Sequence, residues 1–176
     1  AKSLIDKHIE ATGGAAVLKE RKSTRAVGTL SVPSQGLNGT VEIVAMRANK
    51  MLQKQSINGI GDIVEGFDGT HAWSNDPMRG PNLATGKELE ERTLDADFDA
   101  NLNVGTRYTS MKTLEKTTFD GKECYKLSLT RKDGVQDIDF YDVNTGLKVG
   151  AINTRESGMG KITATSTLPT PTATPT

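Results

Sequence analysis

The chain has 176 residues, enough for one domain with a sizeable core, and its 22 basic and 22 acidic side chains leave no net charge at pH 7. This balance excludes a typical nucleic-acid-binding protein, which carries the basic excess that a phosphate backbone attracts. No apolar run approaches the roughly 20 residues of a membrane-spanning helix. Because the chain begins with Ala1 rather than Met, we expect a cleaved secretory signal and a periplasmic protein, peripheral to a membrane.

Residues 2–12 predict a helix, because Leu4, Ile5, His8 and Ile9 share one helical face and glycines follow at 13 and 14. A short second helical turn is expected around residues 15–20. Strands are predicted at 25–32, 40–48, 50–57 and 60–67, which are rich in Val, Ile, Thr and Met and are separated by Gly, Asn and Pro turn signals. The pair at 68–69, Asp-Gly, predicts a type I′ hairpin turn into a strand at 71–74.

The second half of the chain returns to the hairpin pattern after a loop and a helix. Residues 75–86 predict a Pro/Gly loop, and residues 87–99 predict a helix with apolar positions on one side. Strands are predicted near 109–119, 122–130, 135–141, 147–155 and 161–167, joined by short turns that contain glycine. Only antiparallel strands can be joined by such tight turns. The fold class is therefore α+β over residues 1–164, with one large curved antiparallel sheet and helices packed on one of its faces.

The charges are unevenly distributed along the chain. Residues 1–25 carry a net charge of +3, whereas residues 85–103 carry −4. The acidic segment contains Glu88, Glu91 and Asp95, which we select as candidate partner-binding residues because patches of opposite sign steer association. The alternative is that both segments are helices with ordinary solvated faces.

The composition changes from Thr165 onward. The last twelve residues contain six Thr and three Pro, which favours extended polyproline II over a packed element. At about 3.1 Å per residue, the last ten residues span roughly 30 Å. We predict an extended tail over residues 165–176 whose Pro169, Pro171 and Pro175 contact a partner.

A series of acids and amides suggests calcium, but the spacing fails. The oxygen-bearing side chains are Asp95, Asp97, Asp99, Asn101 and Asn103. Ala100 and Thr106 stand where a calcium loop needs its glycine and its bidentate glutamate. We therefore interpret these residues as a polar helix end and expect no metal or cofactor.

The histidines and the single cysteine give no catalytic set in the linear sequence. His8 and His71 lack a second His or Cys at metal-ligand spacing. Cys124 lies in an alternating strand, where a small apolar thiol packs well. An enzyme would require His71, Cys124 and an acid to meet in the fold. We expect a protein that is not an enzyme, and an enzyme of unknown type is the lesser alternative.

Four segments together resemble the periplasmic outer-membrane lipoprotein-sorting (LolA/LolB-like) superfamily over about residues 1–155. They are IDKHIEATGG at 5–14, EGFDGTHAW at 65–73 leading to DPM at 76–78, FDGKECYKL at 119–127 and FYDVNTGL at 140–147. The resemblance implies an incomplete β-barrel whose concave side is covered by helices. It also implies that acyl chains are carried in the space between the sheet and the helices.

Two functions remain open. The candidate lipid-binding lining comes from alternating strand positions: Leu30, Val32, Val41, Ile43, Met51 and Ile63. The alternative is that these six residues are ordinary core. Aromatic residues make up only 5% of the chain, and those available for a ligand-binding lining can all be used to fill the core instead: Phe67, Trp73, Phe98, Phe119, Tyr125 and Phe140. We therefore favour a membrane-extrinsic structural subunit of a larger membrane protein assembly, such as a photosynthetic reaction-centre and antenna complex or a respiratory complex. The alternative is a periplasmic carrier of lipid or lipoprotein acyl chains.

Overall fold

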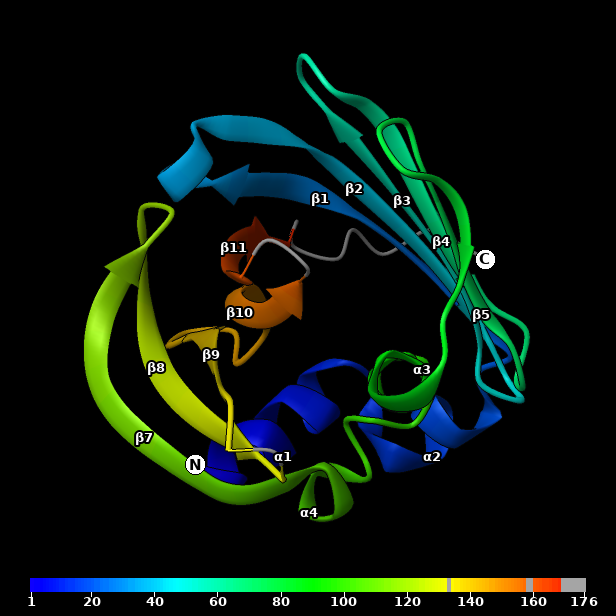
Figure 1. Ribbon diagram of the computed structural model, residues 1–176. Helices are drawn as coiled ribbons and strands as arrows, with labels where there is room; N and C mark the ends of the chain where they lie inside the picture. Colours follow the sequence, from blue (N-terminus) through cyan, green and yellow to red (C-terminus); the bar gives the residue numbers. More distant parts are fainter. Residues whose placement is uncertain (133, 158–159, 169–176) are drawn as a thin grey trace.

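The strands form one continuous antiparallel sheet in the computed structural model, which describes residues 1–132, 134–157 and 160–168. Within these residues the sheet has eleven strands in the spatial order β6-β5-β4-β3-β2-β1-β11-β10-β9-β8-β7 (Figure 1). Their bounds are β1 Ser23–Val32, β2 Leu37–Met46, β3 Lys50–Ile57, β4 Gly61–Phe67, β5 Ala72–Asp76, β6 Gly80–Leu83, β7 Tyr108–Phe119, β8 Lys122–Arg131, β9 Gln136–Asp142, β10 Lys148–Ser157 and β11 Gly160–Thr167.

Two meanders, β1 to β6 and β7 to β11, meet where the first strand pairs with the last. This joint has three residue pairs, Thr29–Thr167, Leu30–Ser166 and Ser31–Thr165, whereas β1 and β2 share ten pairs. Every other neighbour in the sheet is also a neighbour in sequence, because short turns connect antiparallel strands.

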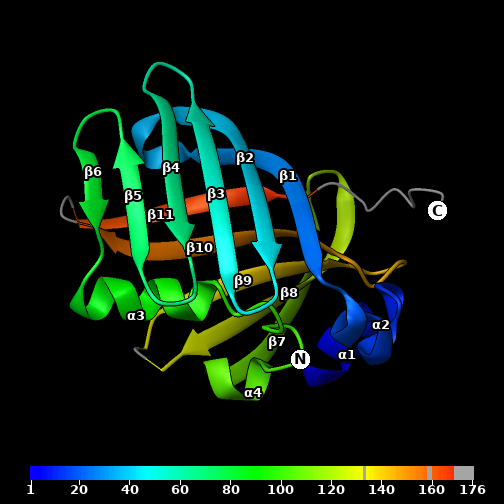
Figure 2. The same ribbon diagram turned by 90° about the vertical axis from the view of Figure 1, so that its right-hand side faces the viewer.

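The sheet curves strongly but does not close, and the helices lie in the opening between its two ends (Figures 1 and 2). The helices are α1 Lys2–Ala11, α2 Gly14–Glu20, α3 Gly86–Asp95 and α4 Val104–Arg107, with a 3₁₀ turn η1 at Pro33–Gln35. The α+β class, with helices against the concave face of a curved antiparallel sheet, is confirmed. Among the described residues, no helix has both the length and the apolar character needed to cross a membrane.

Three apolar clusters stabilise this arrangement. Ile5 of α1 packs with Leu127, Leu129 and Tyr141 on one side of the concave face. Phe67 and Ala72 pack with Ala84 and Ala96 on the other side, beside Leu89 of α3. The third cluster contains Cys124, Phe140 and Val149, and the rings of Phe119 and Phe140 stack there at 4.1 Å. Trp73 differs from the buried Phe67 and Phe140, because 40% of its surface stays exposed.

The type I′ turn predicted at residues 68–69 is wrong. Asp68 avoids positive φ and begins a four-residue loop, in which its carboxylate Oδ1 accepts the backbone N–H groups of Thr70 and His71. The two-residue turn with positive φ at both positions is Asp120-Gly121, at 49° and 74°, between β7 and β8.

Three segments differ from the sequence-based assignment. The loop predicted at 75–86 contains the end of β5 and the short strand β6, α3 ends at Asp95 rather than at residue 99, and α4 was not predicted. Strand β11 runs through Thr167, so residues 165–167 pair within the sheet. The proline positions 169, 171 and 175 lie outside the described residues.

Candidate functional site

Strand register brings all six predicted lining residues to the concave face of the sheet. Side chains alternate between faces along a strand, and directly opposed residues share a face. The cross-strand residue pairs of β1 to β4 place the six side chains on the same face of the sheet as Phe67. This is the concave face, because Phe67 packs beside Leu89 of α3. They are Leu30, Val32, Val41, Ile43, Met51 and Ile63. We call these six residues the apolar wall. Val32 is buried and the other five are half-buried, so the apolar wall keeps accessible apolar surface. Lipid binding by the apolar wall stays a prediction.

Polar groups interrupt the apolar wall toward α3. Glu65 of β4 is buried and lies on the concave face, opposite Gln53 of β3. The amide Nε2 of Gln53 donates to Glu65 Oε2 at 3.2 Å. Both guanidinium ends of Arg92, on α3, donate to the two carboxylate oxygens of Glu65, one of them at 2.7 Å. This ion pair ties α3 to the apolar wall.

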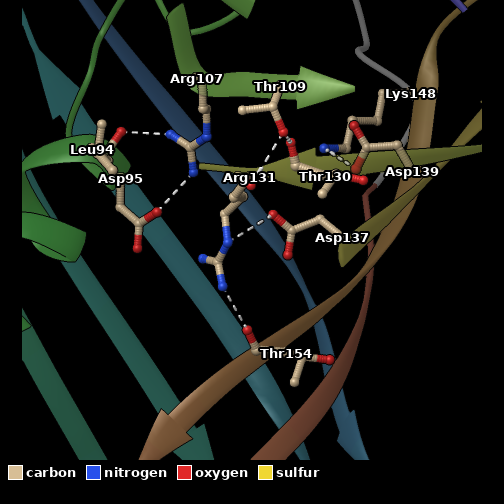
Figure 3. Close-up of polar contacts among 10 residues, drawn as sticks. All are labelled: Leu94, Asp95, Arg107, Thr109, Thr130, Arg131, Asp137, Asp139, Lys148 and Thr154. Atoms are coloured by element: carbon tan, nitrogen blue, oxygen red, sulfur yellow. Dashed lines mark hydrogen bonds and ion pairs between the residues drawn. The ribbon is translucent and has the colours of Figure 1, made fainter. Parts of the chain in front are cut away.

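The opposite side of the concave face, on β8 to β10, carries buried charges beside the apolar cluster of Ile5 (Figure 3). Arg131 of β8 places Nε 3.7 Å from Asp137 Oδ2 of β9, and its Nη2 donates to the carbonyl of Thr154 at 3.1 Å. A charge can be buried at tolerable cost only when it is paired and hydrogen-bonded, so these residues hold one another in place.

A second charged pair, Lys148 and Asp139, lies next to Arg131 and Asp137. The ammonium of Lys148 is 2.7 Å from Asp139 Oδ1, and the hydroxyl of Tyr141 donates to Asp139 Oδ2 at 3.2 Å (Figure 3). Burial disfavours the charged ammonium, but the carboxylate of Asp139 overrides it and raises the pKa of Lys148. Burial, followed by the negative charge of Asp139, raises the pKa of Tyr141, so the phenol keeps its proton.

His8 connects α1 to this charged group. Its Nδ1 accepts the backbone N–H of Lys148 at 3.2 Å, and its ring meets the Tyr141 ring edge-on with centroids 5.6 Å apart. Burial, and then the positive charge of Lys148, lowers the pKa of His8 to about 4. His8 is therefore neutral near pH 7, with its proton on Nε2.

The predicted acidic partner-binding residues lie in different environments. Glu88 is exposed and Glu91 half-buried on α3. Asp95 forms an ion pair with Arg107 Nη2 at 2.8 Å, and Nη1 of the same guanidinium donates to the carbonyl of Leu94 (Figure 3). The C-terminal end of α3 is thereby fixed to α4.

The calcium-like series is used in local structure. Asp99 pairs with Arg47 at 2.8 Å, and Asp97 Oδ1 accepts the backbone N–H of Asp99 at 3.0 Å. Arg47 also lies over the ring of Phe98 and donates to the carbonyl of Leu18 in α2. In the part of the chain that the structure describes, no three His, Cys, Asp or Glu side chains are placed to hold a metal ion.

His71 and Cys124 lie in different environments. His71 is exposed on the 68–71 loop, with Nδ1 3.4 Å from Asp68 Oδ2. Cys124 is buried beside Phe140 and Val149, and this burial raises its pKa. Its thiol is thus a packing group, as its place in an alternating strand predicts.

The charged groups of β8 to β10 were missed from the sequence. Their partners are six to nine residues apart on neighbouring strands, so no local motif connects them. One signal was present: Asp137 and Asp139 alternate with Ile138 and Phe140, which places acids at every second position of an interior strand.

No family model matches the chain, and no curated protein matches it in sequence. Solved structures match over nearly the whole chain. An uncharacterised conserved protein from Thermus thermophilus has a TM-score of 0.52 at 6% identity, with 95% of this chain and 83% of that chain covered. A LolA superfamily protein from Nitrosomonas europaea has a TM-score of 0.42 at 13% identity, with 97% and 91% covered. A chain of the Pseudomonas aeruginosa MucA/MucB complex matches with a TM-score of 0.43 at 10% identity, and 94% of this chain is covered.

The protein spans about half, 54%, of the length of that matched chain. Identities this low concern the fold alone. An open, strongly curved antiparallel sheet with helices against its concave face is the architecture that the sequence resemblance implies. The match to the Thermus thermophilus protein supports this architecture, an open and strongly curved antiparallel sheet, for the chain.

Proposed function

We propose that the protein is a non-enzymatic periplasmic carrier that holds an acyl chain of a lipid or lipoprotein against the concave face of β1 to β4. The observation that carries the proposal is the apolar wall, in which five of six aligned side chains stay half-buried rather than fully packed. A core residue of no other use is normally packed on all sides. Apolar surface that faces the inside of a curved sheet favours an apolar ligand.

The charged groups on β8 to β10 limit where such a ligand lies. Arg131, Asp137 and Asp139 are buried and paired, and Leu127 and Leu129 beside them are buried in the Ile5 cluster, so these residues offer no accessible apolar surface. An acyl chain gains free energy only where it covers apolar area. We therefore expect a ligand to lie along β1 to β4, away from the charged groups.

Neighbouring residues of β2 provide a matched test. Ile43 faces the concave side and Val44 the convex side, and both are half-buried. A fluorescent long-chain fatty acid should bind the wild-type protein and be displaced by unlabelled fatty acid. Ile43→Gln, or Ile43→Trp as a steric block, should weaken binding about tenfold, whereas Val44→Gln should leave it unchanged. Equal effects at both positions, or no binding to the wild-type protein, would contradict the carrier function.

A second candidate, the membrane-extrinsic structural subunit, has support from the convex face. Leu52, Trp73 and Leu83 lie in one cross-strand row with Gly66 and keep 45%, 40% and 64% of their surface exposed. Exposed apolar groups that line up across strands are typical of contacts with another protein. A carrier with an internal site has no need of them.

The two functions separate in native extracts. A structural subunit should co-purify with a membrane protein assembly, such as a photosynthetic or respiratory complex, after gentle solubilisation. Removing residues 169–176 should loosen that attachment; the cut belongs after Leu168, because the Leu168 N–H still donates to Val149 in the sheet. Recovery of the full chain only as a free monomer from periplasmic extract would rule out this second function.

A further inference from the structure

An uncharged groove lies at the β5–β6 end of the sheet. It has a volume of about 630 Å³ and is lined by Trp73, Ser74, Asn75, Pro81, Asn82 and Leu83. A quarter of the chain's residues are charged, yet none of these six is. The groove is separate from the apolar wall, because Trp73 and Leu83 are on the convex face.

Trp73 is held in place by a glycine on the neighbouring strand. Gly66 lies directly opposite Trp73, and a Cβ added there would lie only 2.4–2.6 Å from three atoms of the indole. The indole therefore lies directly over the Gly66 backbone. Leu83 opposes Trp73 from the other side and stays mostly exposed. The result is a fixed aromatic surface beside an exposed leucine.

The edge of the sheet favours a side-chain contact here over addition of another strand. Pro81 lies in the edge strand β6 and has no N–H to offer a further strand. A fixed indole with the Asn75 side chain on the same face of the sheet instead matches the way that proline-rich segments are bound. Their rings pack on aromatic side chains, and their carbonyls, free of internal hydrogen bonds, accept from side-chain donors.

The chain itself contains a segment of this chemistry. Residues 162–176 include no charged side chain, and prolines stand at 169, 171 and 175. We propose that the Trp73 groove binds the Thr/Pro-rich segment 169–176 of a second copy of this chain. This inference does not depend on lipid binding by the concave face.

The bound segment must come from a second copy, because the distance from Leu168 to the groove of the same copy is too large. Leu168 is anchored next to β11, and β1, β2, β3 and β4 lie between β11 and β5. Five strand spacings amount to about 24 Å along the sheet. Eight residues in polyproline II extend about 25 Å, so they would be used up in reaching the groove and would have none left to fill it. A contact between tail and groove of different copies is heterologous, and it links copies head to tail.

The only tryptophan of the chain is in the groove, so its fluorescence reports on this site alone. For the full chain, we expect the weight-average mass in sedimentation to rise from micromolar to millimolar concentration, with a blue shift of Trp73 emission. Excess peptide of residues 165–176 should return the chain to a monomer while keeping the blue shift, since the peptide then occupies the groove.

Two variants should weaken self-association at least about tenfold: Leu83→Ser, and the triple change Pro169→Ala, Pro171→Ala and Pro175→Ala. Leu114→Ser is the matched control, because Leu114 is 50% exposed on β7 at the other end of the sheet. The proposal is overturned if neither concentration nor peptide changes the emission of Trp73. It is also overturned if only phosphatidylglycerol vesicles shift the emission, or if the shift is independent of concentration.

Discussion

Arg92 and Glu65 form a two-point ion pair in which both guanidinium ends of a helix residue meet both carboxylate oxygens of a strand residue. Both side chains are largely shielded from water, Glu65 more than Arg92. Arg92→Met leaves the Glu65 carboxylate without its main cation, and we expect the free energy of unfolding to fall by about 2–4 kcal/mol. Urea unfolding followed by circular dichroism measures this loss.

The double change Glu65→Leu with Arg92→Leu should recover most of that stability, because an apolar pair of similar size avoids a lone buried charge. Asp6→Asn is the surface control: it removes the exposed pair with Lys2 on α1 and should change stability by less than about 0.5 kcal/mol. A double variant no more stable than Arg92→Met would show that α3 depends on the charges themselves.

His8 should make stability depend on pH between about 4 and 6.5. The unfolded chain takes up a proton at His8 below pH 6.5, whereas the folded chain does so only near pH 4, so lowering the pH through this range favours unfolding. The contribution of neutral His8 to the free energy of unfolding is fully present above pH 6.5, and about 3 kcal/mol of it is lost by pH 4. Urea midpoints measured from pH 7 to pH 5, where most carboxylates stay ionised, should show the decline.

His8→Asn should flatten that profile, because the side-chain oxygen of Asn accepts the Lys148 N–H without titrating. His71→Asn, on an exposed loop, should leave the slope as it is in the wild-type protein. A slope unchanged by His8→Asn would assign the pH dependence to other groups.

Gly150 should not tolerate alanine. A Cβ at this position would lie 2.2 and 2.5 Å from two ring atoms of Phe119 and 2.8 Å from the carbonyl oxygen of Ser166. Gly150→Ala should cost about 1–3 kcal/mol by displacing that ring. Gly105→Ala is the control, because nothing lies within 4 Å of its Cβ position and alanine favours the helix. Thermal unfolding of the two variants gives the comparison.

Tyr141 contributes a buried hydrogen bond to Asp139 as well as its ring. Tyr141→Phe keeps the ring against Ile5 and His8 but removes the donor, and stability should fall by about 1–2 kcal/mol. The effect should be larger if Lys148 is first replaced by Met, because the hydroxyl then carries more of the hydrogen bonding of the buried Asp139 carboxylate. Additive losses in this double-mutant cycle would show that the hydroxyl and the ammonium act independently.

The regular parts of the fold could be predicted because their signals are local. Glycine, asparagine and proline mark the turns, and Asp120-Gly121 has the positive φ values that only a few residues accept. Period-two alternation then assigned Val41 and Ile43 to one face, and the register agrees. Strand β6 was missed because Pro81 argues against a strand, although a proline is tolerated at an edge.

The charged half of the site could not be found in the same way. Pairs such as Arg131 with Asp137, or Glu65 with Arg92, depend on which strands and helices become neighbours. The exposure of Trp73 also has no local signal, since a tryptophan in a short strand normally packs in the core. Its position follows from Gly66 on the adjacent strand, which the sequence alone does not place opposite it.

The joint between β1 and β11 has a consequence for the order of folding. Strand β1 pairs with β11 only through Thr29–Ser31, and these partners are 134 to 138 residues apart in sequence. While the chain emerges from its N-terminal end, β1 to β6 can form, but the outer edge of β1 stays open until the last strand has been made. Contacts of such long range slow folding, and the open strand edge invites association with other chains in the meantime. The protein should therefore depend on a chaperone, or on low concentration, until the last strand is added to the sheet.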